Sequence, residues 1–238
     1  MITARGAAIA ATALLGAMMA ADAAAPAPIA AQAVTSSAKA PVYNPPPRGA
    51  PGGRIGGGTR GVGADMLVSA LVPDHVGRTM NEQPTVYWYL ARDASDPVEI
   101  TLIDQVGTRP LLEHRLAPPV PAGIHAVRLA DHGVRLAAGV PYQWSVAIVR
   151  DGGRRSRDVI SGGFIERVEP PTALGRQLAD ARPTERASIY AEAGLWYDAI
   201  AALSERIEAA PNDTDLRRQR AALLEQVGLR EAAEFDRR

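Results

Sequence analysis

The chain has 238 residues, of which 47% are apolar and 22% charged, enough for one or two small packed domains. Lys plus Arg and Asp plus Glu both total 26, so the formal net charge is zero, and no global charge points to nucleic acid or an anionic surface. The absence of cysteine excludes disulfides, thiolate metal ligands, a cysteine nucleophile and lipid attachment through an N-terminal cysteine.

Residues 1–33 have the three-part layout of a secretory signal peptide. Arg5 supplies a positive charge, an apolar run extends from about Gly6 to Ala21, and A-x-A sites end at Ala23 and Ala33. A membrane anchor is the alternative, but the run is short and alanine-rich, and a span needs about 20 predominantly apolar residues. We therefore expect an exported protein, periplasmic or secreted, with no stable membrane insertion after signal cleavage.

Residues 34–63 are rich in Pro and Gly, and their charged residues are all basic. Within them Gly56–Gly61 satisfies the G-x-G-x-x-G pattern of dinucleotide-binding turns. Such a turn follows a buried strand and opens a helix, whereas the preceding PPPRGAPGGR cannot be a central strand. The composition instead predicts a basic linker that is flexible or covers a sheet edge and buries little apolar surface.

Residues 64–169 are predicted to form a β-sandwich domain. Short segments rich in β-branched and aromatic residues are separated by Pro and Gly, which favours an antiparallel sandwich of the immunoglobulin or fibronectin kind; a partly open barrel is the alternative. Alternation is clearest where Tyr142, Trp144, Val146 and Ile148 share a face. The predicted strands are Thr85–Leu90, Val98–Asp104, Ile124–Leu129, Pro141–Arg150 and Asp158–Arg167.

Residues 170–238 change to a helical period. Two successive stretches align with each other at the tetratricopeptide period of about 34 residues, so the overall class is predicted to be α+β with a tetratricopeptide-like helical region. Pro183, Arg186 and Arg206 depart from that motif and the second copy is incomplete, so an unrelated helical hairpin is the alternative. The matched pairs are Ala187 with Ala221, Tyr190 with Leu224, Gly194 with Gly228, Leu195 with Leu229 and Ala199 with Ala233.

The densest basic cluster is DGGRRSRD, where Arg154, Arg155 and Arg157 lie on a predicted hairpin tip. Guanidinium groups bind phosphates and carboxylates, which makes these three residues candidates for interaction with a phosphate or an acidic partner. Asp151 and Asp158 flank the cluster and reduce its net charge, and a solvated turn is the alternative.

Trp196 and Tyr197 lie at the predicted turn between two helices. Large aromatic side chains at such a place either pack the helical region against the sheet or contact a partner. Packing is the favoured interpretation, and both residues are also candidate interaction residues.

The sequence predicts no cofactor, no metal site and no catalytic residue. Its histidines show no helical ligand spacing and no H-E-x-x-H pattern, and G-x-S-x-G is absent. Glu166 and Glu169 could serve in acid–base chemistry, but an exposed strand end with local ion pairs is the simpler interpretation. The histidines are His75, His114, His125 and His132.

The order of these segments is similar to that of a known family. The glycine stretch RIGGGTRG, the strand YQWSVAIVRD, the block RSRDVISGGFIERVEP and the helical ERASIYAEAGLWYDAIAAL resemble the domain of unknown function 928 family, which is frequent in cyanobacteria. These blocks span most of residues 49–228, and the helical one is the least specific because ordinary tetratricopeptide repeats share it. The resemblance implies the domain boundaries and export, and it implies no catalytic or binding residue.

From these features we expect a non-enzymatic interaction or adaptor module of the cell envelope. The reason is that two recognition-type architectures occur with no catalytic motif. It would bind an envelope protein through its helical region, and, since the net charge is zero, no nucleic acid. A small-molecule or glycan sensor that uses Arg154–Arg157 and the histidines is the second hypothesis. A hydrolase of unfamiliar design that uses residues among Glu166, Glu169 and the four histidines is the third.

Overall fold

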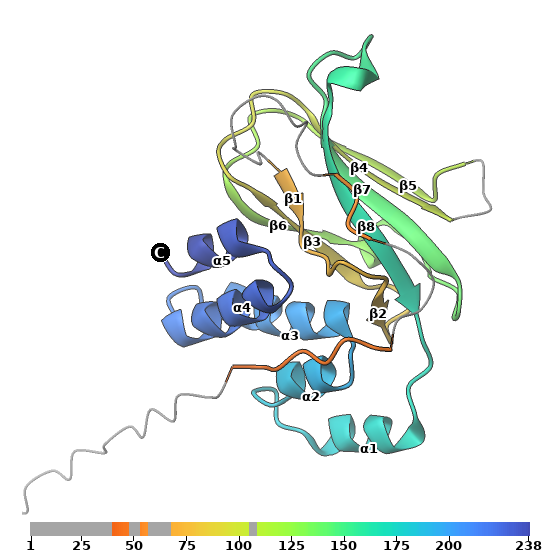
Figure 1. Cartoon of the computed structure of the whole chain (residues 1–238), viewed down its shortest axis with the longest axis vertical. Coiled ribbons are helices and arrows are strands. Elements are labelled where there is room, and N and C mark those ends of the chain that lie inside the picture. Colours follow the sequence, from red (N-terminus) through yellow and green to blue (C-terminus); the bar gives the residue numbers. More distant parts are fainter. Residues whose placement is uncertain (1–39, 48–52, 57–67, 105–108) are drawn as a thin grey trace, which may run out of the picture. The chain divides into compact units, whose positions relative to one another are not determined.

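The computed structural model describes residues 40–47, 53–56, 68–104 and 109–238. Within these ranges the protein has a mixed α+β structure with two sheets and five α-helices (Figure 1). The predicted signal peptide, residues 1–33, lies outside the described residues, as do Gly57–Gly61 of the glycine pattern. Among the helices of the described ranges, all are too short or too polar to cross a bilayer.

The larger sheet has the strand order β2-β8-β7-β4-β5. Neighbouring strands are antiparallel except β2 and β8, which are parallel. Period-two burial explains the central strands: Val98, Ile100 and Leu102 of β4 are at most 1% exposed, whereas the residues between them are partly exposed. The strands are β2 (Gly77–Thr79), β4 (Val98–Asp104), β5 (Leu112–Leu116), β7 (Pro141–Ile148) and β8 (Val159–Arg167).

The smaller sheet has the antiparallel order β1-β3-β6, from Val68–Ala70, Thr85–Leu90 and Gly123–Arg128. Strand β3 is buried at Val86–Leu90 on both faces, as expected for a strand covered from two sides. The two sheets meet at β1 and β8, where the Ser161 hydroxyl accepts a hydrogen bond of 2.9 Å from the Ala70 N–H.

The predicted strands are confirmed, with small differences at their ends. The shared face of Tyr142, Trp144, Val146 and Ile148 is also confirmed, since all four are buried. Three strands were not predicted. β1 and β2 have three residues each, too few to show a period, and β5 reads LEHRL, with only Leu112 buried.

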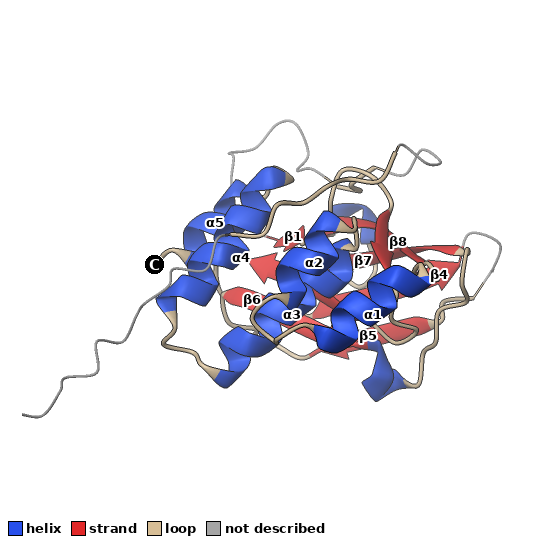
Figure 2. Ribbon diagram, turned by 90° about the horizontal axis from the view of Figure 1, so that it is seen from below, coloured by secondary structure: helices blue, strands red, loops and turns tan. Residues whose placement is uncertain are grey.

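The helical region comprises α1 (Thr172–Asp180), α2 (Arg186–Glu192), α3 (Trp196–Ala209), α4 (Thr214–Gln226) and α5 (Arg230–Asp236). The Asp213 side chain caps α4 by accepting hydrogen bonds from the N–H groups of Asp215 and Leu216, which otherwise lack an intrahelical acceptor. In Figure 1 the helices lie below and to the left of the strands, and Figure 2, seen from below, shows α1 and α2 in front of them.

The internal similarity of the two helical stretches has a structural counterpart. Gly194 and Gly228 both have a left-handed backbone, with φ of 74° and 76°, and each ends one helix before the next begins. The following N–H groups make equivalent hydrogen bonds, from Leu195 to the Tyr190 carbonyl and from Leu229 to the Leu224 carbonyl. The helix pair α2–α3 is therefore repeated in its turn geometry by α4–α5.

The helices share a core with the sheets. The Trp196 indole N–H donates to the Leu71 carbonyl at 2.8 Å, and the Tyr197 hydroxyl donates to the Phe164 carbonyl of β8 at 3.0 Å. Asp198, in the first turn of α3, accepts a hydrogen bond of 3.0 Å from the Met80 N–H just after β2. Three consecutive residues thus attach α3 to the strands.

Candidate functional site

Arg154, Arg155 and Arg157 lie between β7 and β8 in what we call the basic turn. Only part of their positive charge is available to a partner. Arg155 binds the Glu99 carboxylate through two hydrogen bonds of 2.7 and 3.2 Å and also forms an ion pair with the buried carboxylate of Asp158. The hydrogen bond from Arg155 holds the pKa of Glu99 below its usual value. Arg154 and Arg157 are exposed and carry the outward positive charge of the turn.

Trp196 and Tyr197 are buried, with 0% and 1% of their surface exposed. The prediction that they pack the helical region against the sheet is confirmed by their hydrogen bonds to Leu71 and Phe164. With residues 40–47 in place neither side chain has exposed surface to offer a partner, so their candidacy as exposed interaction residues has to be corrected. Gly77 fits against Tyr197, because a Cβ there would lie 2.6 Å from the Tyr197 ring.

The histidines occupy three separate places. His114 in β5 and His132, in the 3-10 turn Leu129–His132, have ring centroids 4.7 Å apart. His125 stacks on Trp88 at 4.3 Å, and His75 stacks on Tyr43. In the described part of the chain, no group of three or more His, Asp or Glu side chains could hold a metal ion, and these contacts do not assemble the histidines with the basic turn.

The arrangement that sequence reasoning missed is a peptide-like segment held by the helices. Residues 40–47 run past α2 and α4 in an extended conformation (Figure 1), and their burial alternates, with Pro41 and Tyr43 buried and Val42 and Asn44 exposed. The low apolar content of residues 34–63 argued against packing, yet Tyr43 belongs to the core, with 8% of its surface exposed. The one feature of the sequence that could have indicated this packing is a single tyrosine, Tyr43, in a Pro-rich run.

The Gln226 side chain at the end of α4 binds the main chain of this segment. Its amide NH2 donates to the Pro41 carbonyl at 2.8 Å, and its Oε1 accepts from the Tyr43 N–H, also at 2.8 Å. The Asn44 N–H then donates to the Ala191 carbonyl at 3.0 Å. These hydrogen bonds therefore bind main-chain atoms of the segment and do not depend on its side chains.

Tyr43 occupies an aromatic pocket. Its ring meets Trp196 edge to face, with centroids 5.1 Å apart, and stacks on His75 at 5.9 Å. The Tyr43 hydroxyl lies 2.9 Å from His75 Nε2, and His75 Nδ1 lies 3.1 Å from the Asp74 carboxylate. Burial raises the pKa of Tyr43, so its hydroxyl stays protonated.

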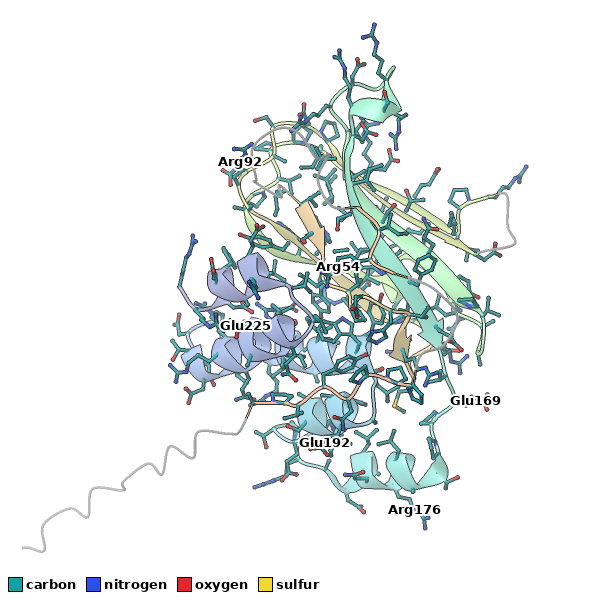
Figure 3. All side chains as sticks on the ribbon, in the orientation of Figure 1. Arg54, Arg92, Glu169, Arg176, Glu192 and Glu225 are labelled. Atoms are coloured by element: carbon teal, nitrogen blue, oxygen red, sulfur yellow. The ribbon has the colours of Figure 1, made fainter. Side chains whose placement is uncertain are left out.

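Arg54 attaches residues 53–56, which we call the sheet-edge segment, to the sheet and to the helices. Its guanidinium donates to the Val72 carbonyl at 2.7 Å and to the Val227 carbonyl, just after α4, at 2.8 Å, and Figure 3 shows it between these elements. Ile55 exchanges two backbone hydrogen bonds of 2.8 Å with Gly162 of β8. These residues therefore cover the edge of β8 beyond its pairing with β2 at Ile165–Arg167, and edge covering is one of the two roles that their composition allowed.

Two comparisons with known proteins bear on this chain. The model of a family described as Domain of Unknown Function (DUF928) matches residues 55–236. No curated protein matches the chain. The matched range begins within the sheet-edge segment and includes the strands and helices that form the groove for residues 40–47, while those residues themselves precede it.

Proposed function

Because this chain belongs to the DUF928 family, whose description assigns no activity, we propose from its own surfaces that it is an exported, non-enzymatic protein-interaction module of the cell envelope. The observation that supports this most directly is the way in which the helices hold residues 40–47. Gln226 and Ala191 bind that segment through its main chain, which is how proteins commonly bind extended peptides.

The architecture that we assign to the module has two parts. The two sheets would form an immunoglobulin-like or fibronectin-like sandwich, supported by their largely antiparallel pairing and by the contact of β1 with β8. The helices would be tetratricopeptide-like, supported by the spacing of the repeated stretches and by the matching turns at Gly194 and Gly228. Helical repeats of this type present concave surfaces to peptides.

The test is a crosslinking pull-down from envelope extract, with identification of the crosslinked residues. Three forms of the full chain serve as bait: wild type, Gln226→Ala, and the double variant Arg154→Ala/Arg157→Ala. A partner that is lost with Gln226→Ala and kept by the double variant supports recognition through the helices. Absence of any saturable partner with all three baits would contradict the adaptor function.

The double variant also tests the sensor hypothesis. Arg154 and Arg157 are exposed at a turn, where guanidinium groups can bind an anionic ligand. A ligand that binds the folded state raises the melting temperature by mass action. If anionic envelope metabolites raise it for wild type and leave the double variant unchanged, the sensor function replaces the adaptor function.

A further inference from the structure

We propose that the groove occupied by residues 40–47 is a binding site for an extended, proline-flanked tyrosine peptide of a partner protein, and that the chain's own segment fills it as an internal ligand. We call it the segment groove; it is formed by His75, Ala191, Glu192, Gly194, Trp196 and Gln226. This inference rests on the proposed function and specifies the class of partner.

The backbone contacts fix the conformation of the ligand. Gln226 brackets one residue by binding the carbonyl of Pro41 and the N–H of Tyr43, two groups that point to the same side of an extended chain. The Pro residues on either side favour that conformation before binding. A ligand of this composition therefore loses little conformational entropy when it binds.

The end of α2 provides a second set of acceptors. The Ala191 carbonyl, which also accepts from the Gly194 N–H, accepts from the Asn44 N–H at 3.0 Å. The Glu192 carbonyl accepts from the Asn44 side-chain amide at 3.3 Å. The groove therefore favours a residue with a side-chain donor directly after the tyrosine.

The tyrosine is the anchor of the ligand. Tyr43 is buried between Trp196 and His75, and its hydroxyl has a polar neighbour at His75 Nε2. Phenylalanine would fill the same space and lose the hydroxyl contact. Val42, by contrast, is 49% exposed, so that position of the ligand is open to many residues. The class of ligand is Pro-x-Tyr-Asn-Pro.

A comparison of two equivalent glycines shows that the groove is specific to one of the two helix turns. Gly194 and Gly228 have the same left-handed backbone. A Cβ at Gly194 would lie 2.9 Å from the Asn44 carbonyl oxygen, whereas a Cβ at Gly228 would meet nothing within 4 Å. Of these two glycines, Gly194 lies against the bound segment and Gly228 does not.

The experiment uses the full chain and a fluorescent peptide with the sequence of residues 40–47, APVYNPPP. In wild type the tethered segment competes at a high effective concentration, so the added peptide should bind weakly. The Tyr43→Ala chain, whose own segment has lost its anchor, should bind the peptide at least about tenfold more tightly. A peptide with alanine in place of its tyrosine should not bind.

Matched variants locate the binding. In the Tyr43→Ala background, Gly194→Ala should block the peptide, while Gly228→Ala, with the same backbone strain and open space, should leave binding unchanged. If Tyr43→Ala does not fold, as judged by near-ultraviolet circular dichroism, the readout is hydrogen exchange in wild type. Excess peptide should then accelerate exchange of the Tyr43 and Asn44 amides.

The proposal is overturned if a folded Tyr43→Ala chain fails to bind the peptide, or, where that variant is unfolded, if excess peptide leaves the exchange unchanged. Equal binding to the Gly194→Ala and Gly228→Ala forms would also overturn it. Such a failure leaves the proposed function standing when the pull-down still captures a partner that crosslinks at another surface. Failure of the pull-down as well would remove both.

Discussion

The indole N–H of Trp144 in β7 donates a hydrogen bond of 2.8 Å to the hydroxyl of Tyr197 in α3. The same hydroxyl donates to the Phe164 carbonyl of β8. One phenol oxygen therefore joins the first turn of a helix to two adjacent strands, in a place where Trp144 and Tyr197 are both buried. This contact therefore contributes to the stability of both α3 and the larger sheet.

Tyr197→Phe should lower the free energy of unfolding by about 1–3 kcal/mol, because the buried Trp144 N–H then lacks its acceptor. Urea unfolding followed by tryptophan fluorescence measures this. Tyr190→Phe is the control, since Tyr190 is only partly buried, and should change stability little. Equal effects of the two variants would show that the Trp144–Tyr197 hydrogen bond is unimportant.

A chain that ends at Pro170 should fail to form the native sheets. Removal of the helices exposes the surfaces that Trp196 and Tyr197 cover and leaves the Leu71 and Phe164 carbonyls without these donors. Near-ultraviolet circular dichroism and binding of a hydrophobic dye measure the result. A soluble truncated chain with a cooperative unfolding transition would contradict the shared core.

The Asp198 carboxyl group should contribute less to the free energy of unfolding as the pH rises from about 4 to 7. Burial raises the pKa of Asp198 to about 7 from an ordinary value of 3.8, so the folded state holds its proton more tightly than the unfolded state does. The contribution is complete below the unfolded pKa and is lost as the pH rises through the folded pKa.

The Asp198→Asn variant isolates this effect, since its amide oxygen can still accept from the Met80 N–H. The difference in unfolding free energy between wild type and variant should move in favour of the variant between pH 4 and pH 8, by on the order of a few kcal/mol. Urea unfolding at several pH values measures it. A difference that does not depend on pH would refute the assignment.

Gly56→Ala should detach the sheet-edge segment. Gly56 has φ of 82°, and a Cβ there would lie 2.0 Å from the Ile160 carbonyl oxygen. Gly139→Ala is the matched control, with φ of 72° and open space, and should cost only the backbone strain of about 1 kcal/mol. Hydrogen exchange of the Ile55 and Gly162 amides should accelerate in the first variant alone.

The buried ion pair between Arg220 and Asp236 links α4 to α5, with two hydrogen bonds of 2.6 and 2.7 Å. Arg220→Met should cost about 3–5 kcal/mol because it leaves a buried carboxylate without its partner. The double variant Arg220→Met/Asp236→Leu should cost less than that single change. Thermal and urea unfolding decide this.

The exposed pair between Arg237 and Glu225, the latter labelled in Figure 3, is the control for that measurement. Arg237→Met should cost about 1 kcal/mol or less, since solvent screens exposed ion pairs. If Arg220→Met were equally mild, the buried pair would contribute little to the packing of α5.

The sequence by itself determined the elements whose periodicity is long enough to read. Strand β7 alternates over most of its length, and the turns at Gly194 and Gly228 recur at the spacing of the two helical stretches, because local burial patterns and turn chemistry are properties of short stretches. The same reasoning argues against dinucleotide binding at Gly56–Gly61, since the preceding PPPRGAPGGR cannot be a central strand.

Only the tertiary structure decided where the segment groove lies and that Trp196 and Tyr197 are buried. Tyr43 contacts Trp196 and Gln226, which lie far away in the sequence, and composition averages over a segment in which one buried tyrosine is outnumbered by Pro and Gly. Long-range contacts of this kind depend on how complete elements pack. Periodicity records that a face is buried, but it does not identify the residues that cover it.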